Sequence, residues 1–522
     1  MSKAISAEQA AALIKDGATL GASVLGLAGW PEELAVEIEK RFLATDHPKD
    51  ITLVHSSTSG DHKEKGSGHL AHEGLIKRLY CGNTAGAPLM AEMVQEGKIE
   101  CYLIPQGVVC QLWRAVAGNK PGVITKVGLG TYVDPRLEGG KITAKTTEDL
   151  VEVIELGGEE WLFYKKFPID VAIIRGSVAD ENGNLTMDRE MAILEALPLA
   201  MAAKNSGGIV LAQVEQVAKE GTLHPKKVRV PGTLVDYVFT AKPENHMQTQ
   251  QTYYNPAFAG DIKVPMGDIP PLEMNEKKIV ARRAAAELAP NSVVNLGVGI
   301  PTNISAVAAE EGVSDEMTLT TEIGIFGGVP ASARFDFGAA FNAEAVIEHA
   351  AMFDFYDGGG LDVTYLGAAQ IDSEGNVNVS KFGNIVTGPG GFVNISQTSK
   401  KVVFCSTFTS KAELEFGDGK MVIKKEGKSN KFVEKVDQVT FSGKYAGQIK
   451  QPVFYVTERA VFQIIDSKIT LIEIAPGIDL EKDVLALLPF SPAVSPSLKT
   501  MDPDIFKPQW GKLKEIIARA KN

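Results

Sequence analysis

A strand, a glycine loop, a helix and a second strand follow one another in the second half of this chain. Residues 293–296 are mostly apolar and predict the first strand, residues 297–301 predict a tight glycine loop, and residues 303–311 predict the helix. A second apolar run ends at Glu322, directly before a glycine-rich loop. Strands joined through a helix are parallel, and ligands bind at the carboxyl ends of such strands. Glu322 is therefore the first candidate for chemistry.

The same order of elements occurs near the amino terminus. A predicted strand at residues 18–23 precedes a glycine loop that ends in Pro31, and a helix follows. Pro301 takes the corresponding place in the later unit. A gene duplication explains this repetition. The expected fold is therefore of the α/β class, with two similar open α/β domains that each contain a mainly parallel sheet.

The chain of 522 residues is longer than a single hydrophobic core supports. Residues 241–275 are rich in proline and polar residues and show no hydrophobic periodicity, which is typical of a linker. We expect a first domain over residues 1–244, a Pro-rich linker over residues 245–275, and a second domain over residues 276–522 that carries Glu322.

Composition narrows the class of protein. Hydrophobic residues make up 44% of the chain and charged residues 23%, as in soluble globular proteins. The net charge of −12 argues against a nucleic-acid or anionic-membrane surface. The sequence contains no apolar run long enough to span a membrane, no signal peptide, and only four cysteines without a paired motif. We expect a cytoplasmic protein with no nucleic-acid and no membrane partner.

Four histidines lie close together in the sequence and could suggest a metal site: His55, His62, His69 and His72. Their spacing matches no recognised zinc pattern, and the glycine and polar residues among them predict a loop. We expect no metal.

A single carboxylate such as Glu322 can carry out acyl transfer without a histidine or serine partner. It is ionised at neutral pH, and it becomes a nucleophile toward an activated acyl group when a closed site removes its water. The reaction also needs donors for the oxyanion, and backbone N–H groups of glycine loops suit that role. Two such loops follow Glu322, at residues 358–360 and 388–391. These features together favour acyl transfer through a mixed anhydride.

Two other interpretations use the same residues. Gly297 and Gly299, followed by a helix and then by an acid at a strand end, approach the dinucleotide-binding fingerprint of a dehydrogenase. Against it, Thr302 occupies the third glycine position, and Pro301 removes a backbone N–H that could face a pyrophosphate. In the second interpretation Glu322 has only a structural role, as a capping or ion-pairing group.

Glu181 is a second candidate for the catalytic carboxylate that we assign to Glu322. It lies in the sequence Asp-Glu-Asn-Gly at residues 180–183, and a similar cluster at residues 372–376 occupies the corresponding place in the other half. Asparagine and glycine tolerate positive φ, so both clusters predict tight turns. A turn shared by both halves is a scaffold feature, and we expect Glu181 to have no catalytic role.

Four motifs in this order resemble the family I CoA-transferases: Ile-Pro-Gln-Gly at residues 104–107, Gly-Val-Gly-Ile-Pro at residues 297–301, Thr321-Glu322 before a glycine-rich loop, and Gly-Pro-Gly-Gly at residues 388–391. The chain looks most like the single-chain propionate (lactate) and acetate CoA-transferases. The resemblance implies two similar open α/β domains with the active site between them. It also implies a coenzyme A thioester as substrate with no permanently bound cofactor, and a homo-oligomer of two or four chains.

The resemblance also implies roles for individual residues. Glu322 matches the glutamate that is acylated and then holds CoA as a thioester, and Gln106 matches a glutamine that polarises the thioester carbonyl. One of Gly390 and Gly391 matches the glycine whose N–H completes the oxyanion hole, and the sequence does not choose between them. The glycines expected to contact CoA are Gly297, Gly299, Gly388, Gly390 and Gly391. Many members read Ser-Glu-Asn-Gly where this chain reads Thr-Glu-Ile-Gly, so a role of that asparagine does not transfer.

The expected function is transfer of CoA from a short-chain acyl-CoA to a short-chain carboxylate of the acetate, propionate or lactate type. The route is ping-pong through a glutamyl-CoA thioester. An acyl-CoA hydrolase on the same fold and a nucleotide-dependent dehydrogenase are the alternatives, and a non-catalytic ligand sensor on this fold is a third possibility.

Overall fold

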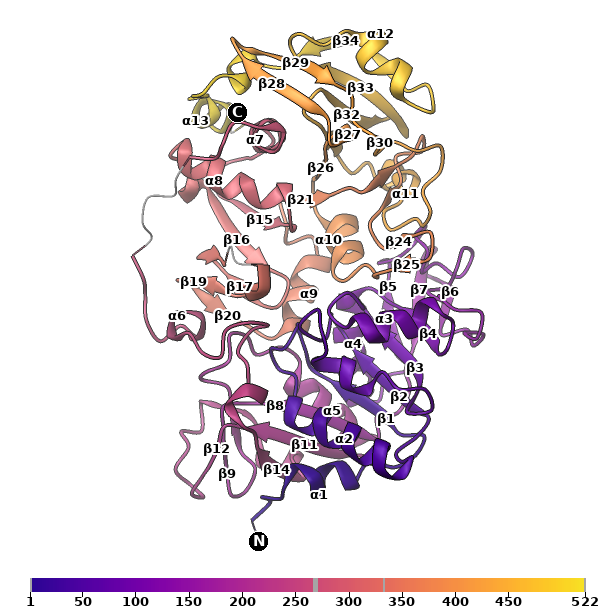
Figure 1. The fold of residues 1–522 in the computed structure, drawn as a ribbon, viewed down its shortest axis with the longest axis vertical. Helices are drawn as coiled ribbons and strands as arrows, with labels where there is room; N and C mark the ends of the chain where they lie inside the picture. The colour runs from indigo at the N-terminus through magenta and orange to yellow at the C-terminus, as the bar shows by residue number, and fades with distance from the viewer. Residues whose placement is uncertain (1, 266–270, 332–333, 521–522) are drawn as a thin grey trace. The chain divides into compact units, whose positions relative to one another are not determined.

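The computed structural model describes residues 2–265, 271–331 and 334–520 (Figure 1). The chain forms two compact units. Unit 1 contains the residues up to Val264 together with Thr321–Asp354 and Gly383–Asn394, and unit 2 contains the remainder. Two segments of the expected second domain therefore belong to unit 1. The division into a first domain over residues 1–244, a linker over residues 245–275 and a second domain over residues 276–522 stays a prediction.

The central sheet of unit 1 contains seven strands of the described chain, all parallel, in the order β14-β11-β8-β1-β2-β3-β4. These strands are β1 (Thr19–Ala22), β2 (Ile51–His55), β3 (Ile76–Cys81), β4 (Glu100–Leu103), β8 (Val171–Arg175), β11 (Ile209–Val214) and β14 (Tyr237–Thr240). Every residue of β8 is buried, as expected where helices cover both faces of a parallel sheet.

Helices surround this sheet in the indigo-to-purple part of Figure 1. They are α1 (Ala7–Ala12), α2 (Glu32–Thr45), α3 (Pro88–Gln95), α4 (Gln106–Ala117) and α5 (Ala196–Asn205), and the short α6 (Pro256–Ala259) follows later in the chain. Trp30 and Trp113 are completely buried in unit 1. The predicted strand at residues 18–23 is confirmed as β1.

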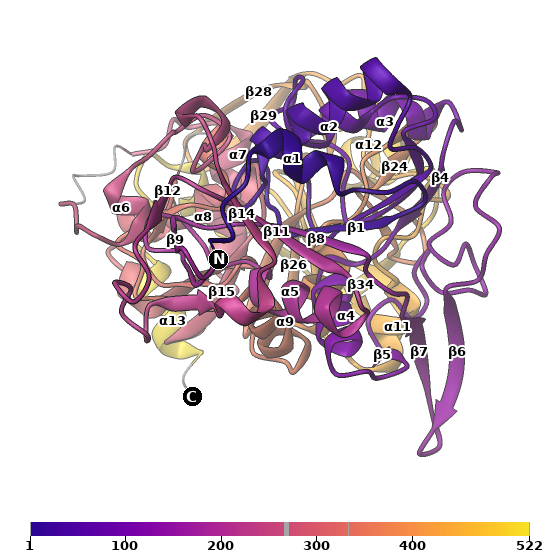
Figure 2. The ribbon, with the colours of Figure 1, turned by 90° about the horizontal axis from the view of Figure 1, so that it is seen from below.

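Smaller strands of unit 1 form two further sheets and two short pairs. The sheet β12-β9-β10-β13 consists of β9 (Val178–Asp180), β10 (Leu185–Thr186), β12 (Gln216–Ala218) and β13 (Val228–Val230). The sheet β5-β7-β6 consists of β5 (Gly122–Thr125), β6 (Val151–Leu156) and β7 (Glu159–Lys165), and Figure 2 shows the β6–β7 hairpin extending from the rest of the unit. The pairs join β17 (Ile325–Phe326) to β20 (Ala345–Val346) and β18 (Val329–Pro330) to β19 (Ala340–Phe341).

Unit 2 has a sheet whose strands follow one another in the order β16-β15-β21-β26-β31-β32-β33-β34, with parallel pairing from β16 to β31. They are β15 (Ser292–Leu296), β16 (Met317–Thr321), β21 (Val363–Gly367), β26 (Val402–Cys405), β31 (Val453–Val456), β32 (Ala460–Ile465), β33 (Lys468–Ile474) and β34 (Ala493–Thr500). Its helices include α7 (Glu276–Ala285), α8 (Asn303–Glu310), α11 (Gly443–Gln448), α12 (Leu480–Asp483) and α13 (Leu513–Arg519). The predicted strand-loop-helix-strand unit is confirmed as β15, α8 and β16.

The remaining elements are short. They are β22 (Gln370–Ile371), β23 (Val377–Asn378), β24 (Lys381–Phe382), β25 (Ile385–Val386), β27 (Thr409–Ser410), β28 (Glu413–Gly417), β29 (Lys420–Lys425), β30 (Ser429–Asn430), α9 (His349–Asp357) and α10 (Phe392–Thr398). The two mainly parallel sheets confirm the predicted α/β class. The predicted linker contains α6, and its residues 266–270 lie outside the described residues. Among the described helices, none combines the length and the apolar composition that crossing a membrane requires.

The acidic cluster at residues 180–183 is a turn, as predicted. The Asp180 carboxylate accepts hydrogen bonds from the backbone N–H groups of Asn182 and Asn184, at 3.0 Å and 2.9 Å. In the other half the Asp372 carboxylate accepts from the N–H groups two and four residues later, both at 3.0 Å. The side chain of Glu181 pairs with Lys219 at 3.0 Å. The same turn is therefore built twice.

Glu181→Ala is expected to keep most transferase activity and a melting temperature close to that of the wild type. The reason is that Glu181 points to a surface lysine and its backbone turn is held by Asp180. Initial rates of CoA exchange and thermal unfolding of the purified variant measure both effects. Loss of exchange in a folded Glu181→Ala protein would contradict the assignment of this residue to the scaffold.

Two of the four clustered histidines bind carboxylates of helix α2. The ring of His69 lies between Glu39, at 2.6 Å from Nδ1, and Glu32, at 3.1 Å from Nε2. His72 contacts Glu39 through Nε2 at 2.8 Å. Burial alone would lower the pKa of His69, but the hydrogen bonds and charges of Glu32 and Glu39 outweigh it and raise this pKa to about 9. His69 is therefore a cation that ties α2 to the segment at residues 66–70.

The free energy of unfolding should consequently fall as the pH rises from about 6.5 to about 9. The sign follows from the raised pKa in the folded state: stabilisation by protonated His69 is complete below the ordinary histidine pKa and is lost as the pH passes about 9. Urea titrations at several pH values measure the trend. His69→Gln should remove this part of the pH dependence, whereas the exposed control His224→Gln should keep it. An unchanged slope in His69→Gln would contradict the assignment.

Candidate active site

Glu322 lies in the turn directly after β16, at the position that the sequence predicts. The turn closes with a hydrogen bond of 3.1 Å from the Gly324 N–H to the Thr321 carbonyl. Gly324 has a φ of 109°, and a Cβ atom at this position would lie 2.1 Å from the Ile347 carbonyl oxygen. Only glycine fits both conditions. The glycine after the acid therefore sets the path by which the chain leaves the strand end.

The carboxyl group of Glu322 is closely surrounded by protein although part of the residue stays exposed. Burial raises the pKa of Glu322, and its own backbone N–H opposes this shift. A carboxylate with few water contacts is a better nucleophile than one in bulk water. His349 begins α9 and belongs, like Glu322, to unit 1.

Gln106 is the first residue of α4 and is 1% exposed. Its side-chain Nε2 lies 2.8 Å from Nε2 of His349. Its backbone N–H donates a hydrogen bond of 3.0 Å to the Gly390 carbonyl. Gln106 therefore contacts both His349 and the glycine loop, and the structure brings these residues together in unit 1.

The glycine loop at residues 388–391 is held by the segment that follows β3. The Gly390 N–H donates to the Gly82 carbonyl at 2.8 Å, and the Asn83 side chain donates to the Gly388 carbonyl at 3.3 Å. A Cβ atom on Gly388 would lie 2.6 Å from the Gly82 carbonyl oxygen. Among the described residues, no hydrogen bond from the Gly391 N–H is present. Of the two candidate glycines, Gly390 therefore uses its N–H within the protein, and Gly391 has an N–H available for a ligand.

Glu195, which the sequence analysis did not identify, contacts His349 at the ring nitrogen opposite Gln106. Its carboxylate Oε1 lies 3.0 Å from His349 Nδ1 and accepts hydrogen bonds from Ser56 and, at 3.2 Å, from Cys110. Oε2 accepts from Ser23 at 3.0 Å. The Nδ1 contact is an ion-pair contact without the alignment of a good hydrogen bond. Glu195 and His349 are far apart in the chain and no motif joins them, so only the fold could reveal this pair.

The charge state of Glu195 follows from these contacts. Burial would raise the pKa of its carboxyl group, but the neighbouring His349 and the hydrogen bonds from Ser56 and Cys110 hold this pKa below its ordinary value. Glu195 is therefore an ionised, fully buried carboxylate. Ser56, which directly follows β2 as Glu322 directly follows β16, donates a hydrogen bond to Glu195.

By residue type, Cys110, Glu195 and His349 could hold a metal, because their ligand atoms lie within 4.8 Å of one another. The contacts of Glu195 with the other two, at 3.0 Å and 3.2 Å, are those of an ion pair and a hydrogen bond, and all three residues are buried. The trio therefore has the geometry of a hydrogen-bonded cluster.

The other predicted glycines, Gly297 and Gly299, belong to unit 2. Gly297 donates its N–H to the Tyr365 carbonyl at 2.8 Å, so this N–H already has a backbone partner. Gly299 is exposed, with a φ of 97°. The Thr302 hydroxyl donates to the Gly299 carbonyl at 2.7 Å. Contact of either glycine with CoA stays a prediction.

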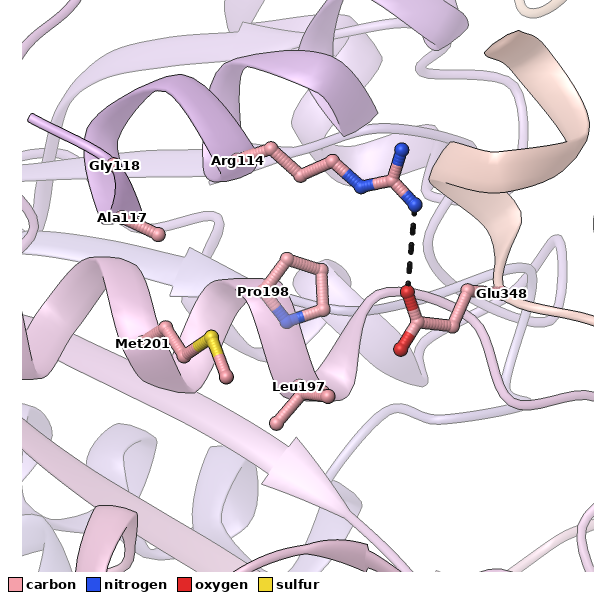
Figure 3. A pocket seen from close by; sticks show the side chains of 7 residues that line it. All are labelled: Arg114, Ala117, Gly118, Leu197, Pro198, Met201 and Glu348. Carbon is pink, nitrogen blue, oxygen red and sulfur yellow. Dashed lines mark ion pairs between the residues drawn. The ribbon is translucent and has the colours of Figure 1, made fainter. Parts of the chain in front are cut away.

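A cavity of about 310 Å³ opens between the end of α4 and the start of α5. Figure 3 shows its lining, with Arg114 facing Glu348 at 3.5 Å across the opening and Met201 on the side of α5. The residues that line it are Arg114, Ala117, Gly118, Leu197, Pro198, Met201 and Glu348. None of them is a predicted site residue.

Comparisons with known proteins agree with this arrangement. The family model described as Coenzyme A transferase matches residues 4–241 and 277–481. A caffeate CoA-transferase of Acetobacterium woodii is 53% identical over 99% of this chain and 100% of its own length. The acetate CoA-transferase YdiF of Escherichia coli (strain K12) is 42% identical over 96% of this chain and 94% of its own length.

Solved structures give the same result for the fold. The apoenzyme of acyl-CoA transferase YdiF from Escherichia coli O157:H7 superposes with a TM-score of 0.91 at 40% identity, covering 98% of this chain and 97% of that one. Its thioester complex with CoA superposes with a TM-score of 0.90 over the same shares of both chains. The predicted resemblance, fold class and enzyme class are confirmed, and the protein is a CoA-transferase rather than a dehydrogenase. The chain belongs to the coenzyme A transferase family.

Proposed function

We propose that this enzyme transfers CoA from a short-chain acyl-CoA to a short-chain carboxylate through a covalent CoA thioester of Glu322. The observation that carries the proposal is the position of Glu322 directly after a parallel strand, in one compact unit with the Gln106–His349 pair and the glycine loop. The acetate CoA-transferase relative and the CoA thioester complex of YdiF support the same route.

In the first half of the reaction the Glu322 carboxylate oxygen attacks the thioester carbonyl carbon. The carbon–sulfur bond breaks, giving an acyl-glutamyl anhydride and the CoA thiolate. The thiolate then attacks the glutamyl carbonyl carbon, and the bond from that carbon to the bridging oxygen breaks. The first carboxylic acid leaves as its carboxylate, and CoA remains on Glu322 as a thioester. A second carboxylate reverses both steps, so atoms and charge balance without an external proton donor.

Each step passes through a tetrahedral oxyanion that needs hydrogen-bond donors. We assign this role to the side-chain amide of Gln106 and the backbone N–H of Gly391. Gly391 is favoured over Gly390 because the Gly390 N–H already donates to the Gly82 carbonyl. A fixed donor of this type does not have to reorganise during the reaction. It therefore stabilises the transition state more than a hydrogen bond from water does.

Contact of Gly297, Gly299, Gly388, Gly390 and Gly391 with CoA is part of the same proposal. So are a first domain over residues 1–244 and a second over residues 276–522, and the residues matched by the family model support these two halves. We also propose that the enzyme acts in the cytoplasm as a homo-oligomer of two or four chains, without a permanently bound cofactor. The four buried cysteines form no disulfide bonds, which supports a reducing compartment, and sedimentation measures the assembly.

Caffeate is a second candidate acceptor, because a relative that is 53% identical over its full length is a caffeate CoA-transferase. A series of kcat/KM values for acetate, propionate, butyrate, hexanoate and caffeate decides between the candidates. We expect a broad optimum at acetate and propionate, because each extra methylene changes the transition-state energy by only ~1–3 kcal/mol. A caffeate value at least tenfold above the acetate value would replace the short-chain proposal, and a preference for long chains would contradict it.

Hydrolysis of acyl-CoA is the remaining alternative, because a water molecule could replace the second carboxylate. The rate of thioester loss should depend on the concentration of added carboxylate and be close to background without it. Equal rates with and without carboxylate would identify a hydrolase.

A further inference from the structure

Three buried side chains of unit 1 form a continuous row that ends at Gln106. Glu195 and His349 have no exposed surface, and Gln106 is 1% exposed. Glu195 Oε1 lies 3.0 Å from His349 Nδ1, and His349 Nε2 lies 2.8 Å from Gln106 Nε2. Each ring nitrogen of His349 therefore has a different neighbour. The chemistry of those neighbours decides where the imidazole carries its proton.

Glu195 is the acceptor in this row. It already accepts hydrogen bonds from Ser23, Ser56 and Cys110, and an ionised carboxylate has no proton to donate. His349 Nδ1 therefore carries a proton toward it. The opposite nitrogen, Nε2, then has a lone pair to offer, and the neighbouring Gln106 amide nitrogen has two N–H groups.

We propose that Glu195 and His349 are positioning residues that fix the orientation of the Gln106 amide. One N–H of Gln106 donates to His349 Nε2, which leaves the second N–H for the oxyanion. This inference rests on the proposed role of Gln106. Rotation of the amide by half a turn would exchange its nitrogen for its oxygen, and an oxygen would repel the oxyanion. In the described structure the rotated amide would also place two acceptors, Gln106 Oε1 and His349 Nε2, against each other.

The oxygen and the nitrogen of the Gln106 amide have different neighbours. A Cβ atom on Gly390 would lie 3.5 Å from Gln106 Oε1, so the amide oxygen lies beside the glycine loop while the nitrogen lies beside His349. The titratable group in contact with His349 is Glu195, which accepts a hydrogen bond from Cys110. Phe353 covers the ring, with ring centres 5.3 Å apart.

Two substitutions of His349 separate positioning from packing. The Gln side chain can place an acceptor oxygen where Nε2 stands, whereas the shorter Asn side chain reaches only the place of Nδ1. We expect His349→Asn to lower kcat roughly 10–100-fold, the usual loss for a residue that orients a functional group, with KM for acyl-CoA nearly unchanged. His349→Gln should recover most of kcat. Equal kcat values in the two variants, or a loss confined to KM, would overturn the inference.

A double-mutant cycle with Gln106→Ala tests whether His349 acts through Gln106. In the Gln106→Ala background, His349→Asn should cause no further loss of kcat, because the amide to be oriented is absent. Losses that simply multiply would overturn the inference. Trapping CoA on Glu322 of the wild type is the companion measurement. Absence of the adduct would defeat the proposed function, whereas an adduct together with multiplicative losses would defeat only the positioning role.

Nitrogen NMR of the full-length wild-type enzyme keeps the inference testable if His349→Asn fails to fold. With ¹⁵N-labelled histidine, we expect the ring signals of a proton at Nδ1 and a hydrogen-bond acceptor at Nε2, identified by loss of these signals in His349→Gln. Glu195→Gln should shift the proton toward Nε2, because an amide can donate to Nδ1. A His349 ring protonated at Nε2 in the wild type would overturn the inference.

Discussion

Glu322→Ala is expected to abolish CoA transfer, with a fall in kcat of roughly 10⁴-fold or more, as for removal of other catalytic nucleophiles. The reason is that Glu322 directly follows the parallel strand β16 and lies in unit 1 together with the Gln106–His349 pair. Steady-state exchange of CoA between two carboxylates measures the loss. Circular dichroism and thermal unfolding verify that the variant folds.

Glu322→Asp is the matched variant for this prediction. It keeps the charge but withdraws the carboxylate by one methylene, and a misplacement of about 1 Å costs on the order of 10²-fold in rate. Its activity should therefore lie between those of the wild type and Glu322→Ala, while Glu181→Ala stays close to the wild type. Normal exchange in folded Glu322→Ala would contradict the assignment of the nucleophile.

Gln106→Ala has the second largest expected effect. Loss of one oxyanion donor lowers kcat roughly 10²–10³-fold, and binding of CoA should change little because the amide acts on the reacting carbonyl. The helix-mate Gln111→Ala is the control, since the Gln111 side chain donates to Asp354 at 3.2 Å and has no assigned role in the reaction. Measuring kcat and KM for Gln106→Ala and Gln111→Ala distinguishes loss of an oxyanion donor from the effect of shortening a glutamine on the same helix. An unchanged kcat in Gln106→Ala would make Gln106 a structural residue.

Local patterns predicted most of the secondary structure around Glu322. The strand ends, the helix after Pro301 and the paired turns at Asp180 and Asp372 follow from hydrophobic periodicity and from the backbone preferences of glycine and asparagine. Such signals depend on neighbours in the sequence, so a single chain contains them. Glu322 became the candidate nucleophile because it places a carboxylate at the end of an apolar run that predicts a strand.

The residues behind the site could not be predicted in the same way. Glu195 and His349 meet only after the chain has folded, and neither lies in a motif. The proposed choice of Gly391 over Gly390 also depends on a group far away in the sequence, the Gly82 carbonyl that accepts from the Gly390 N–H. The division of the chain into compact units could not be predicted for the same reason. Residues 321–354 join unit 1 because of contacts that are far apart in sequence.

Mass spectrometry of the peptide that contains Glu322, after incubation of the enzyme with acyl-CoA alone, tests the central claim most directly. Without an acceptor the reaction should stop at the glutamyl-CoA thioester, so the peptide should carry the mass of CoA at Glu322. Hydroxylamine should convert the adduct to a hydroxamate, and borohydride should reduce it, each inactivating the enzyme. A wild-type enzyme that exchanges CoA but carries no adduct on this peptide, or carries it on another residue, would contradict the account.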